Sequence, residues 1–293
     1  MKYVLLETYN FSKKTFNTLV SVLSVLFFSS FTCHRGIEKC KKRQKSHDEC
    51  IVMGNGPSLS DFLDNNINET AQKQMFAVNF FCNSHYFEQI KPSLYILLDP
   101  NLFSSPYKNS LKKNIEELIT RFNKISWEMN LFLPYKAKKS SFTKQINNKN
   151  INIIFFNNTP VEGFRLIEDL LFKRNLGMPM PQTVINAAIF IALNLRFKVV
   201  HLCGVEQSWL KYLSISNNNE VRVGLNHFYK GSDKTGENRT LSEFLLSQVA
   251  VFKSHMRLQE YSCKNGLLIL NHTPGSYIDA YKRASIVDIT SKE

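Results

Sequence analysis

The chain has 293 residues, of which 43% are hydrophobic and 21% charged, and this composition excludes a disordered or fibrous protein. Lys and Arg outnumber Asp and Glu by 37 to 24, which gives a formal net charge of +13. Most of that excess lies in residues 1–50, at +5, and residues 107–150, at +7. Because no helix-turn-helix, RNP or zinc-finger pattern accompanies it, we expect an anionic membrane surface and no nucleic acid as partner.

The amino-terminal part, residues 1–46, is predicted to be a membrane-proximal anchor followed by a basic linker. Residues 18–33 carry no charge, Lys13 and Lys14 precede them, and a basic stretch follows. Sixteen residues are short for a span of about 20. An interfacial anchor, a short span and an ordinary packed helix all remain open. The basic stretch favours retention on the cytoplasmic side.

Residues 47–293 are predicted to form one α/β domain. Short apolar runs with the length of buried strands alternate with helical segments, and this alternation is typical of a parallel sheet with right-handed crossovers. The expected strands are 50–53, 76–78, 95–98, 151–156, 199–203 and 267–270, and the expected helices include 182–195 and 241–265. Residues 107–150 are expected to hold a helix and then a basic, Asn-rich stretch, either a solvated face or a second patch toward the same lipid surface.

Small polar residues follow most of these strands. Ligands bind beyond the carboxyl ends of the strands in open parallel sheets, so these residues are candidates for one binding edge, although Asn also ends strands for turn reasons alone. They are Asn55, Asn79, Asp99, Asn157, Gly204 and Asn271.

Several common catalytic motifs are missing from the sequence. It has no Asp-x-Asp pair, no phosphate loop ending in Gly-Lys-Ser/Thr, no Gly-x-Ser-x-Gly and no His-Glu-x-x-His. The six cysteines have no metal-ligand spacing, so no metal site is expected. The turn at residues 54–58, Gly-Asn-Gly-Pro-Ser, is the main positive signal. Its glycines let backbone N–H groups approach an anionic ligand, Asn55 can bond a phosphate or a sugar hydroxyl, and Ser58 can cap the next helix.

A series of motifs resembles the bacterial lipooligosaccharide sialyltransferases that use CMP-sialic acid. The similarity covers roughly residues 50–283 and extends to a wider group of cell-surface polysaccharide proteins with the same opening turn. The motifs are Gly-Asn-Gly-Pro-Ser-Leu at 54–59, Val-Asn at 78–79, Asp-Pro-x-Leu-Phe at 99–103, the apolar helix with Thr183, Gly-Val-Glu at 204–206, Asn-His-Phe-Tyr at 226–229 and Thr-Pro-Gly-Ser at 273–276.

This resemblance implies a metal-independent, inverting glycosyltransferase with a Rossmann-like sheet, helices on both faces and a small lid at about residues 206–240. It implies a CMP-linked sugar as donor, a cell-surface glycan or glycolipid as acceptor, no separate cofactor, and a place at the cytoplasmic face of the bacterial inner membrane. A homo-oligomer is compatible with it. His227 would be the general base, since an imidazole pKa of about 6.5 suits that role, and Tyr212 and Tyr229 would stabilise phosphate. The donor-binding residues would be Gly54, Asn55, Gly56, Ser58, Asn79, Asp99, Thr183, Gly204, Pro274 and Ser276.

Three alternatives stay open. Some pterin pyrophosphokinase-like proteins share the opening turn, and their chemistry would need Mg²⁺ held by carboxylates such as Asp99, Glu206 and Asp279. A non-catalytic nucleotide-sugar binder is possible because Pro181-Gln182 stands where the sialyltransferases carry an Arg. His272, beside a strand end, is the rival to His227 for the role of base.

Overall fold

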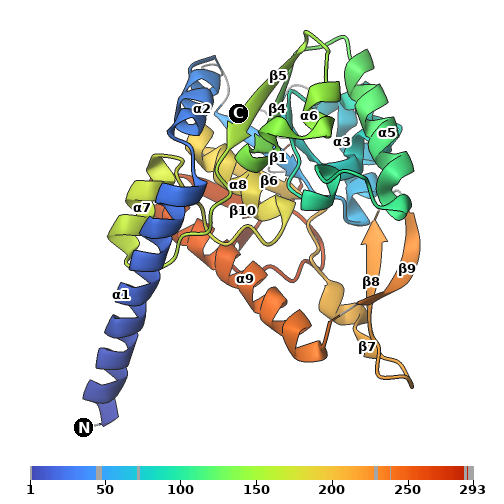
Figure 1. Ribbon diagram of the computed structural model, residues 1–293. Helices are drawn as coiled ribbons and strands as arrows, with labels where there is room; N and C mark the ends of the chain where they lie inside the picture. Colours follow the sequence, from blue (N-terminus) through green and yellow to red (C-terminus); the bar gives the residue numbers. More distant parts are fainter. Residues whose placement is uncertain are drawn as a thin grey trace.

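The computed structural model describes residues 2–43, 48–70, 73–227, 230–237, 239–286 and 289. Its centre is a parallel sheet in the order β11-β10-β6-β1-β2-β3-β4-β5 (Figure 1). The α/β fold class is therefore confirmed, with helices on both faces of the sheet. The strands are β1 (Glu49–Met53), β2 (Gln74–Val78), β3 (Leu94–Ile96), β4 (Met129–Pro134), β5 (Ile151–Phe156), β6 (Val199–Cys203), β10 (Leu268–Asn271) and β11 (Lys282–Arg283).

The direction in which strands are added reverses between β1 and β6. From β1 the chain adds β2, β3, β4 and β5 on one side, and it then returns to pair β6 with the free edge of β1. Such a reversal leaves a crevice beyond the carboxyl ends of the two strands, where the connections leave in opposite directions. Gly54 follows β1 and Gly204 follows β6, so both glycines lie at this point.

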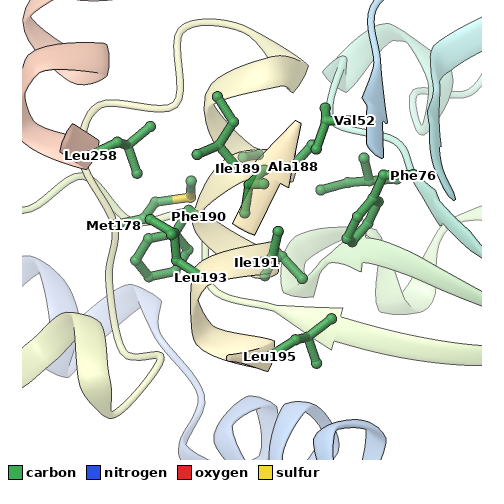
Figure 2. Close-up of a cluster of buried hydrophobic side chains, with 14 of the residues drawn as sticks. Val52, Phe76, Met178, Ala188, Ile189, Phe190, Ile191, Leu193, Leu195 and Leu258 are labelled. Atoms are coloured by element: carbon green, nitrogen blue, oxygen red, sulfur yellow. The ribbon is translucent and has the colours of Figure 1, made fainter. Parts of the chain in front are cut away.

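Two buried apolar clusters, one on each face of the sheet, form the core. Helix α8 (Val184–Leu195) is buried at every position from Ile185 to Leu195 because it lies between the sheet and other helices (Figure 2). The helices on its face are α2 (Phe31–Arg43), α7 (Arg165–Lys173) and α9 (Leu241–Lys264), and the opposite face carries α3 (Ser58–Thr70), α4 (Tyr86–Ile90), α5 (Asn109–Lys124) and α6 (Ser141–Gln145). Short 3₁₀ turns are η1 (Asn79–Asn83), η2 (Pro100–Leu102), η3 (Tyr135–Lys139) and η4 (Trp209–Tyr212).

A small antiparallel sheet lies within the segment that was expected to form a lid. It is built from β7 (Ser214–Ile215), β8 (Val221–His227) and β9 (Lys230–Glu237), and it stands apart from the main sheet in Figure 1. The side chains of residues 225–238 lie outside the described part of the chain.

The basic segment 107–150 contains a strand that the sequence did not predict. Strand β4 is apolar and buried at five of its six positions, and it fills the place between β3 and β5. The prediction missed this strand because lysines and asparagines dominate the composition of the surrounding segment. The following lysines, Lys136, Lys138 and Lys139, lie on η3 and are exposed.

The amino-terminal residues pack on the domain. Cys33, Ile37 and Cys40 of α2 are buried in the core, and a Cβ at Gly36 would lie 3.4 Å from the Ile154 side chain of β5. Helix α1 (Lys2–Phe28) extends away from the sheet in Figure 1. Within the described residues no single helix is long and apolar enough to cross a membrane, although residues 7–28 and 31–43, bent by 83° at the break, pass that test together.

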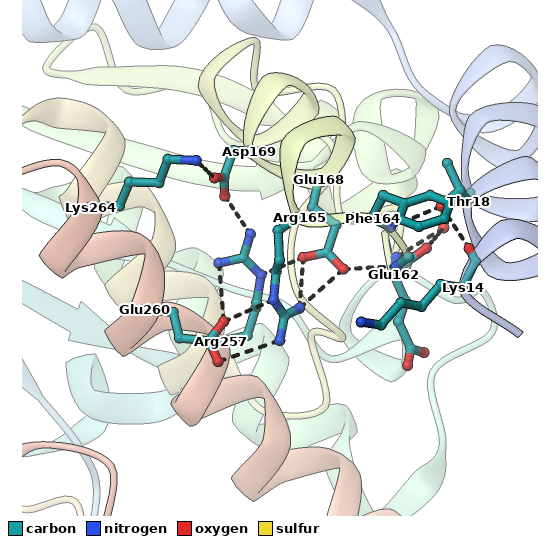
Figure 3. A network of polar contacts seen from close by, with 12 residues as sticks. Lys14, Thr18, Glu162, Phe164, Arg165, Glu168, Asp169, Arg257, Glu260 and Lys264 are labelled. Atoms are coloured by element: carbon teal, nitrogen blue, oxygen red, sulfur yellow. Dashed lines mark hydrogen bonds and ion pairs between the residues drawn. The ribbon is translucent and has the colours of Figure 1, made fainter. Parts of the chain in front are cut away.

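A buried network of charges ties α7 to α9 (Figure 3). Arg257 of α9 donates to both Glu168 and Asp169 of α7, and all three side chains are less than 10% exposed. Burial alone would raise the pKa of the Asp169 carboxyl, but hydrogen bonds from Lys264 and Arg257 outweigh it and lower that pKa. Arg257 also lies over the Phe172 ring, 5.0 Å from its centroid.

Candidate functional site

A cavity of about 390 Å³ opens at the reversal point between β1 and β6. This volume lies within the range of small-molecule sites. The cavity is lined from the ends of β1, β2, β3 and β6, from the start of α8 and from η4. Its polar lining residues are Asn55, Asn79, Asp99, Gln182, Thr183, Glu206, Gln207, Ser208, Trp209 and Tyr212.

Most of the residues predicted to bind the donor come together here. Gly54, Asn55, Gly56, Asn79, Asp99, Thr183, Gly204 and Tyr212 all line the cavity. Ser58, Pro274 and Ser276 do not line it. Ser276 is instead buried and structural, since its hydroxyl donates to the Val205 carbonyl at 2.7 Å and accepts from Asn271 at 3.1 Å.

Two of the predicted strand-end residues serve the packing of other segments. The Asn157 side chain forms two hydrogen bonds with the backbone of Ser30: its Oδ1 accepts from the Ser30 N–H group at 2.8 Å, and its Nδ2 donates to the Ser30 carbonyl at 2.9 Å. The Asn271 Oδ1 accepts from the Thr273 N–H group at 3.0 Å. These asparagines therefore have the turn and packing role that the sequence left open as the alternative to binding.

The turn at residues 54–58 is held tightly against the end of β6. The N–H groups of Gly54 and Gly56 donate to the carbonyls of Cys203 and Gly204 at 2.8 and 2.9 Å. A Cβ at Gly54 would lie 2.2 Å from the Gly204 carbonyl oxygen. The glycines are thus required by the close approach of two strand ends, and their N–H groups are already bonded within the chain.

A carboxylate occupies the amino-terminal end of α3. The Ser58 N–H group donates to Glu206 Oε1 at 2.7 Å, so Glu206 takes the position where a helix end usually attracts an anion. The Ser58 hydroxyl, predicted to cap α3, has no partner among the described residues. Glu206 was named from the sequence as a metal-ligand candidate, but its contact with the turn had no signal in the sequence.

Two residues of the cavity lining carry buried acceptor oxygens that lack donors among the described residues. Asn79 Oδ1 and Glu206 Oε2 have no hydrogen-bond partner in the described part of the chain. Asn79 also holds a left-handed backbone, with φ at +48°, directly after β2. Among the described residues that line the cavity, none is Lys or Arg, whereas Asp99 and Glu206 are acidic. The site therefore calls for a ligand that supplies hydrogen-bond donors or positive charge.

A chain of hydrogen bonds behind the cavity fixes Thr183. Buried His255 lies 2.8 Å from the Tyr281 hydroxyl and 3.0 Å from Gln207 Oε1, and Gln207 donates to Thr183 Oγ1 at 3.4 Å. Since Gln207 Oε1 can only accept, His255 donates from Nε2 and accepts the Tyr281 proton at Nδ1. Thr183 in turn caps α8 by accepting from the Asn186 N–H group. The sequence pointed to Thr183 but not to Gln207, which has a strained backbone with φ at +46°.

The buried His255 makes stability depend on pH. Burial lowers the pKa of His255 to about 3, against about 6.5 in an unfolded chain. Below about pH 6.5 the unfolded state binds a proton at His255 and the folded state does not. The contribution of His255 to the free energy of unfolding is therefore highest above that pH, and it falls by up to about 1.4 kcal/mol per pH unit down to about pH 3.

Urea unfolding at about pH 7 and at about pH 5 measures this loss of stability. We expect His255→Gln to reduce the slope and His85→Gln, at an exposed position, to leave it unchanged. An unchanged slope in His255→Gln would contradict this origin.

The proposed catalytic histidine lies on β8, a strand that contributes one described residue to the cavity wall. Gly224 of the same strand lines the cavity, and a Cβ there would lie 2.7 Å from the Tyr212 Cβ. His227 ends β8, but its side chain and the whole of Tyr229 lie outside the described residues. His272, the rival base, lies 2.9 Å from His201 and 2.7 Å from the Ser285 carbonyl and does not line the cavity.

Comparisons with known proteins place this site in a family. A solved structure, the MAf glycosyltransferase from Magnetospirillum magneticum AMB-1, is similar with a TM-score of 0.49 and 14% identity over 82% of this chain. The similar region is 34% of that structure, so the chain spans about a third of its length. No curated protein matches the chain. The match to the family described as 6-hydroxymethylpterin diphosphokinase MptE-like covers residues 28–211, more than half of the chain and most of the cavity lining, so the chain belongs to the MptE-like family.

Proposed function

We propose that the chain is a transferase that takes a sugar from a nucleotide-linked donor held in the strand-end cavity. The observation that carries this proposal is the pair of buried acceptors, Asn79 Oδ1 and Glu206 Oε2, that have no donor among the described residues. A buried acceptor left without a donor costs about 1–3 kcal/mol. Sugar hydroxyls are donors of the right kind, so a bound sugar toward which the Asn79 and Glu206 side chains turn would satisfy both oxygens.

The rest of the lining fits the same ligand. Gln182, Thr183 and Ser208 offer neutral amide and hydroxyl groups for base edges and ribose, and the rings of Trp209 and Tyr212 can stack on a base or a sugar. The finer proposal is CMP-sialic acid or a related donor, with a cell-surface glycan as acceptor, and it rests on the motif resemblance.

The proposed reaction is a single displacement with inversion. His227 removes the proton from an acceptor hydroxyl, whose oxygen forms a bond to the anomeric carbon. The bond from that carbon to the phosphate oxygen breaks, and its electron pair leaves with the nucleotide. This scheme needs no metal ion, because the proton goes to the imidazole and the phosphate leaves as a stable anion.

A second candidate, Mg²⁺-dependent diphosphoryl transfer, is favoured by the family description and by two carboxylates. Asp99 and Glu206 both line the cavity, and Mg²⁺ is often held by one or two carboxylates together with substrate phosphates. The described residues contain no group of three or more His, Cys, Asp or Glu that could hold a metal. Such an ion would thus rest on these two carboxylates, and it would supply charge neutralisation for the phosphates.

A thermal-shift panel separates the two candidates. CMP-, UDP- and GDP-linked sugars are tested with EDTA or with Mg²⁺, beside ATP and 6-hydroxymethylpterin with Mg²⁺. A ligand present at 100 times its Kd adds about 2.7 kcal/mol to the free energy of unfolding. We expect one nucleotide sugar to raise the midpoint in EDTA. Stabilisation by ATP with Mg²⁺ alone would favour the second candidate and overturn the first.

A matched pair of variants tests whether the ligand is in the cavity. Asn79→Gly removes the side chain but keeps a residue that tolerates the left-handed backbone. It should abolish the ligand-induced shift. Asn219→Gly makes the same change at another left-handed asparagine, exposed and away from the cavity lining, and should keep the full shift.

A further inference from the structure

Helix α1 is held to the domain along one side by its small polar residues. Thr18 Oγ1 accepts from the Phe164 N–H group at 2.9 Å, and Ser21 bonds both the N–H and the carbonyl of Glu162. Val25 on the same side is 4% exposed. Gly163 is required here, because a Cβ on it would lie 2.1 Å from Thr18 Oγ1. The hydroxyl groups of Thr18 and Ser21, which interrupt the apolar sequence, therefore face the protein.

The outer side of α1 and the first turn of α2 expose large apolar side chains. This outer face is defined by Phe16, Leu19, Leu23, Leu26, Phe27 and Phe31, each more than half exposed. Monomeric soluble proteins rarely expose so many neighbouring large apolar groups, and such patches mark interaction surfaces.

The charge around this face is positive. No Asp or Glu occurs from residue 8 to residue 37, a range that includes Lys13 and Arg35. Lys14 lies on the domain side, near Glu162 in Figure 3.

The 3₁₀ turn η3 reaches the last turn of α1, where Lys136 Nζ lies over the Phe28 ring, 5.2 Å from its centroid. Phe28 is itself exposed and follows Phe27 of the outer face. Two segments that are more than a hundred residues apart in sequence thus bring lysines to the end of α1.

We propose that the outer face of α1, together with the lysines of η3, docks on an anionic lipid surface. An apolar face beside basic side chains is the composition of interfacial helices, in which the apolar side enters the acyl boundary and the lysines meet lipid phosphates. A second copy of the chain is disfavoured as the occupant, since it would bring two sets of these lysines together. Because the hydroxyl side of α1 stays bonded to the domain, the helix lies along the surface instead of crossing it.

Vesicle co-sedimentation of the full chain tests this docking without any substrate, so its result is independent of the proposed transfer reaction. We expect strong binding to phosphatidylcholine vesicles that contain phosphatidylglycerol and weak binding to phosphatidylcholine alone. The triple variant Phe16→Glu, Leu23→Glu, Phe27→Glu should weaken binding by roughly 100-fold or more. Ile215→Glu makes the same kind of change at an exposed apolar residue of β7, which lies across the molecule from α1 in Figure 1. This variant should bind vesicles like the unchanged chain.

Neutralising η3 tests the electrostatic part. Lys136→Gln, Lys138→Gln and Lys139→Gln together should weaken binding to the anionic vesicles by roughly fivefold per lysine that reaches the surface, and should not change binding to neutral ones. The thermal midpoints should stay constant, because the substituted side chains are exposed. Equal vesicle binding by all variants would overturn the proposal. A second result would also overturn it: the unchanged chain does not bind vesicles but forms a dimer in sedimentation velocity, and the triple glutamate variant of α1 abolishes that dimer.

Discussion

Replacing Arg257 by alanine is expected to lower the free energy of unfolding by up to about 3–5 kcal/mol. The substitution leaves the carboxylates of Glu168 and Asp169 buried, at 2% and 5% exposure, without the guanidinium that both accept from. It also removes the cation from the Phe172 ring. Urea or thermal unfolding measures the loss, and helix α9 should detach from α7 first.

Lys264 provides the matched comparison for this network. It bonds the same Asp169, at 2.6 Å, but its side chain is half exposed. An exposed ion pair contributes about 0–1 kcal/mol, so Lys264→Ala should cost little. If Arg257→Ala cost no more than Lys264→Ala, the network would not hold α7 and α9 together.

His227→Ala is expected to reduce sugar transfer by roughly 100- to 10,000-fold, the usual contribution of a general base. Because His227 is the last residue of β8 and lies outside the main sheet, the variant should keep the thermal midpoint of the unchanged chain. Initial rates with the donor found in the thermal-shift panel measure the effect. Donor binding should remain, since the base acts on the acceptor.

His85→Ala serves as the control for this substitution. His85 is exposed, precedes α4 and does not line the cavity, so its loss should leave the transfer rate unchanged. Full activity of His227→Ala would remove the proposed base and return attention to the residues of η4.

Strand periodicity and turn residues predicted six of the eight strands described in the main sheet, and missed β4 and β11. β1, β5 and β6 begin and end within one residue of the expected ranges, because each is a short apolar run bounded by polar or turn residues. β4 was missed because its apolar run lies among lysines and asparagines. The amino-terminal segment was ambiguous for a physical reason, since Thr18 and Ser21 weaken an apolar run in sequence but face the protein in the structure.

In the candidate binding edge, the residues at the strand ends were predictable, and the contacts between side chains were not. Asn55, Asn79, Asp99 and Gly204 converge because parallel strands share one carboxyl edge. Neither the contact of Glu206 with the Ser58 N–H group nor the hydrogen bond between His255 and Gln207 could be predicted, because each joins residues 48 or more positions apart. Such contacts depend on how the chain packs and leave no local pattern.

Release of the free nucleotide from a nucleotide-linked sugar by the full chain, in EDTA and with a glycan acceptor, tests the central claim most directly. The proposed mechanism predicts that the nucleotide appears together with glycosylated acceptor, at a rate that added Mg²⁺ does not change. Turnover that requires Mg²⁺, with ATP consumed and no sugar transferred, would contradict it and assign the cavity to diphosphoryl transfer.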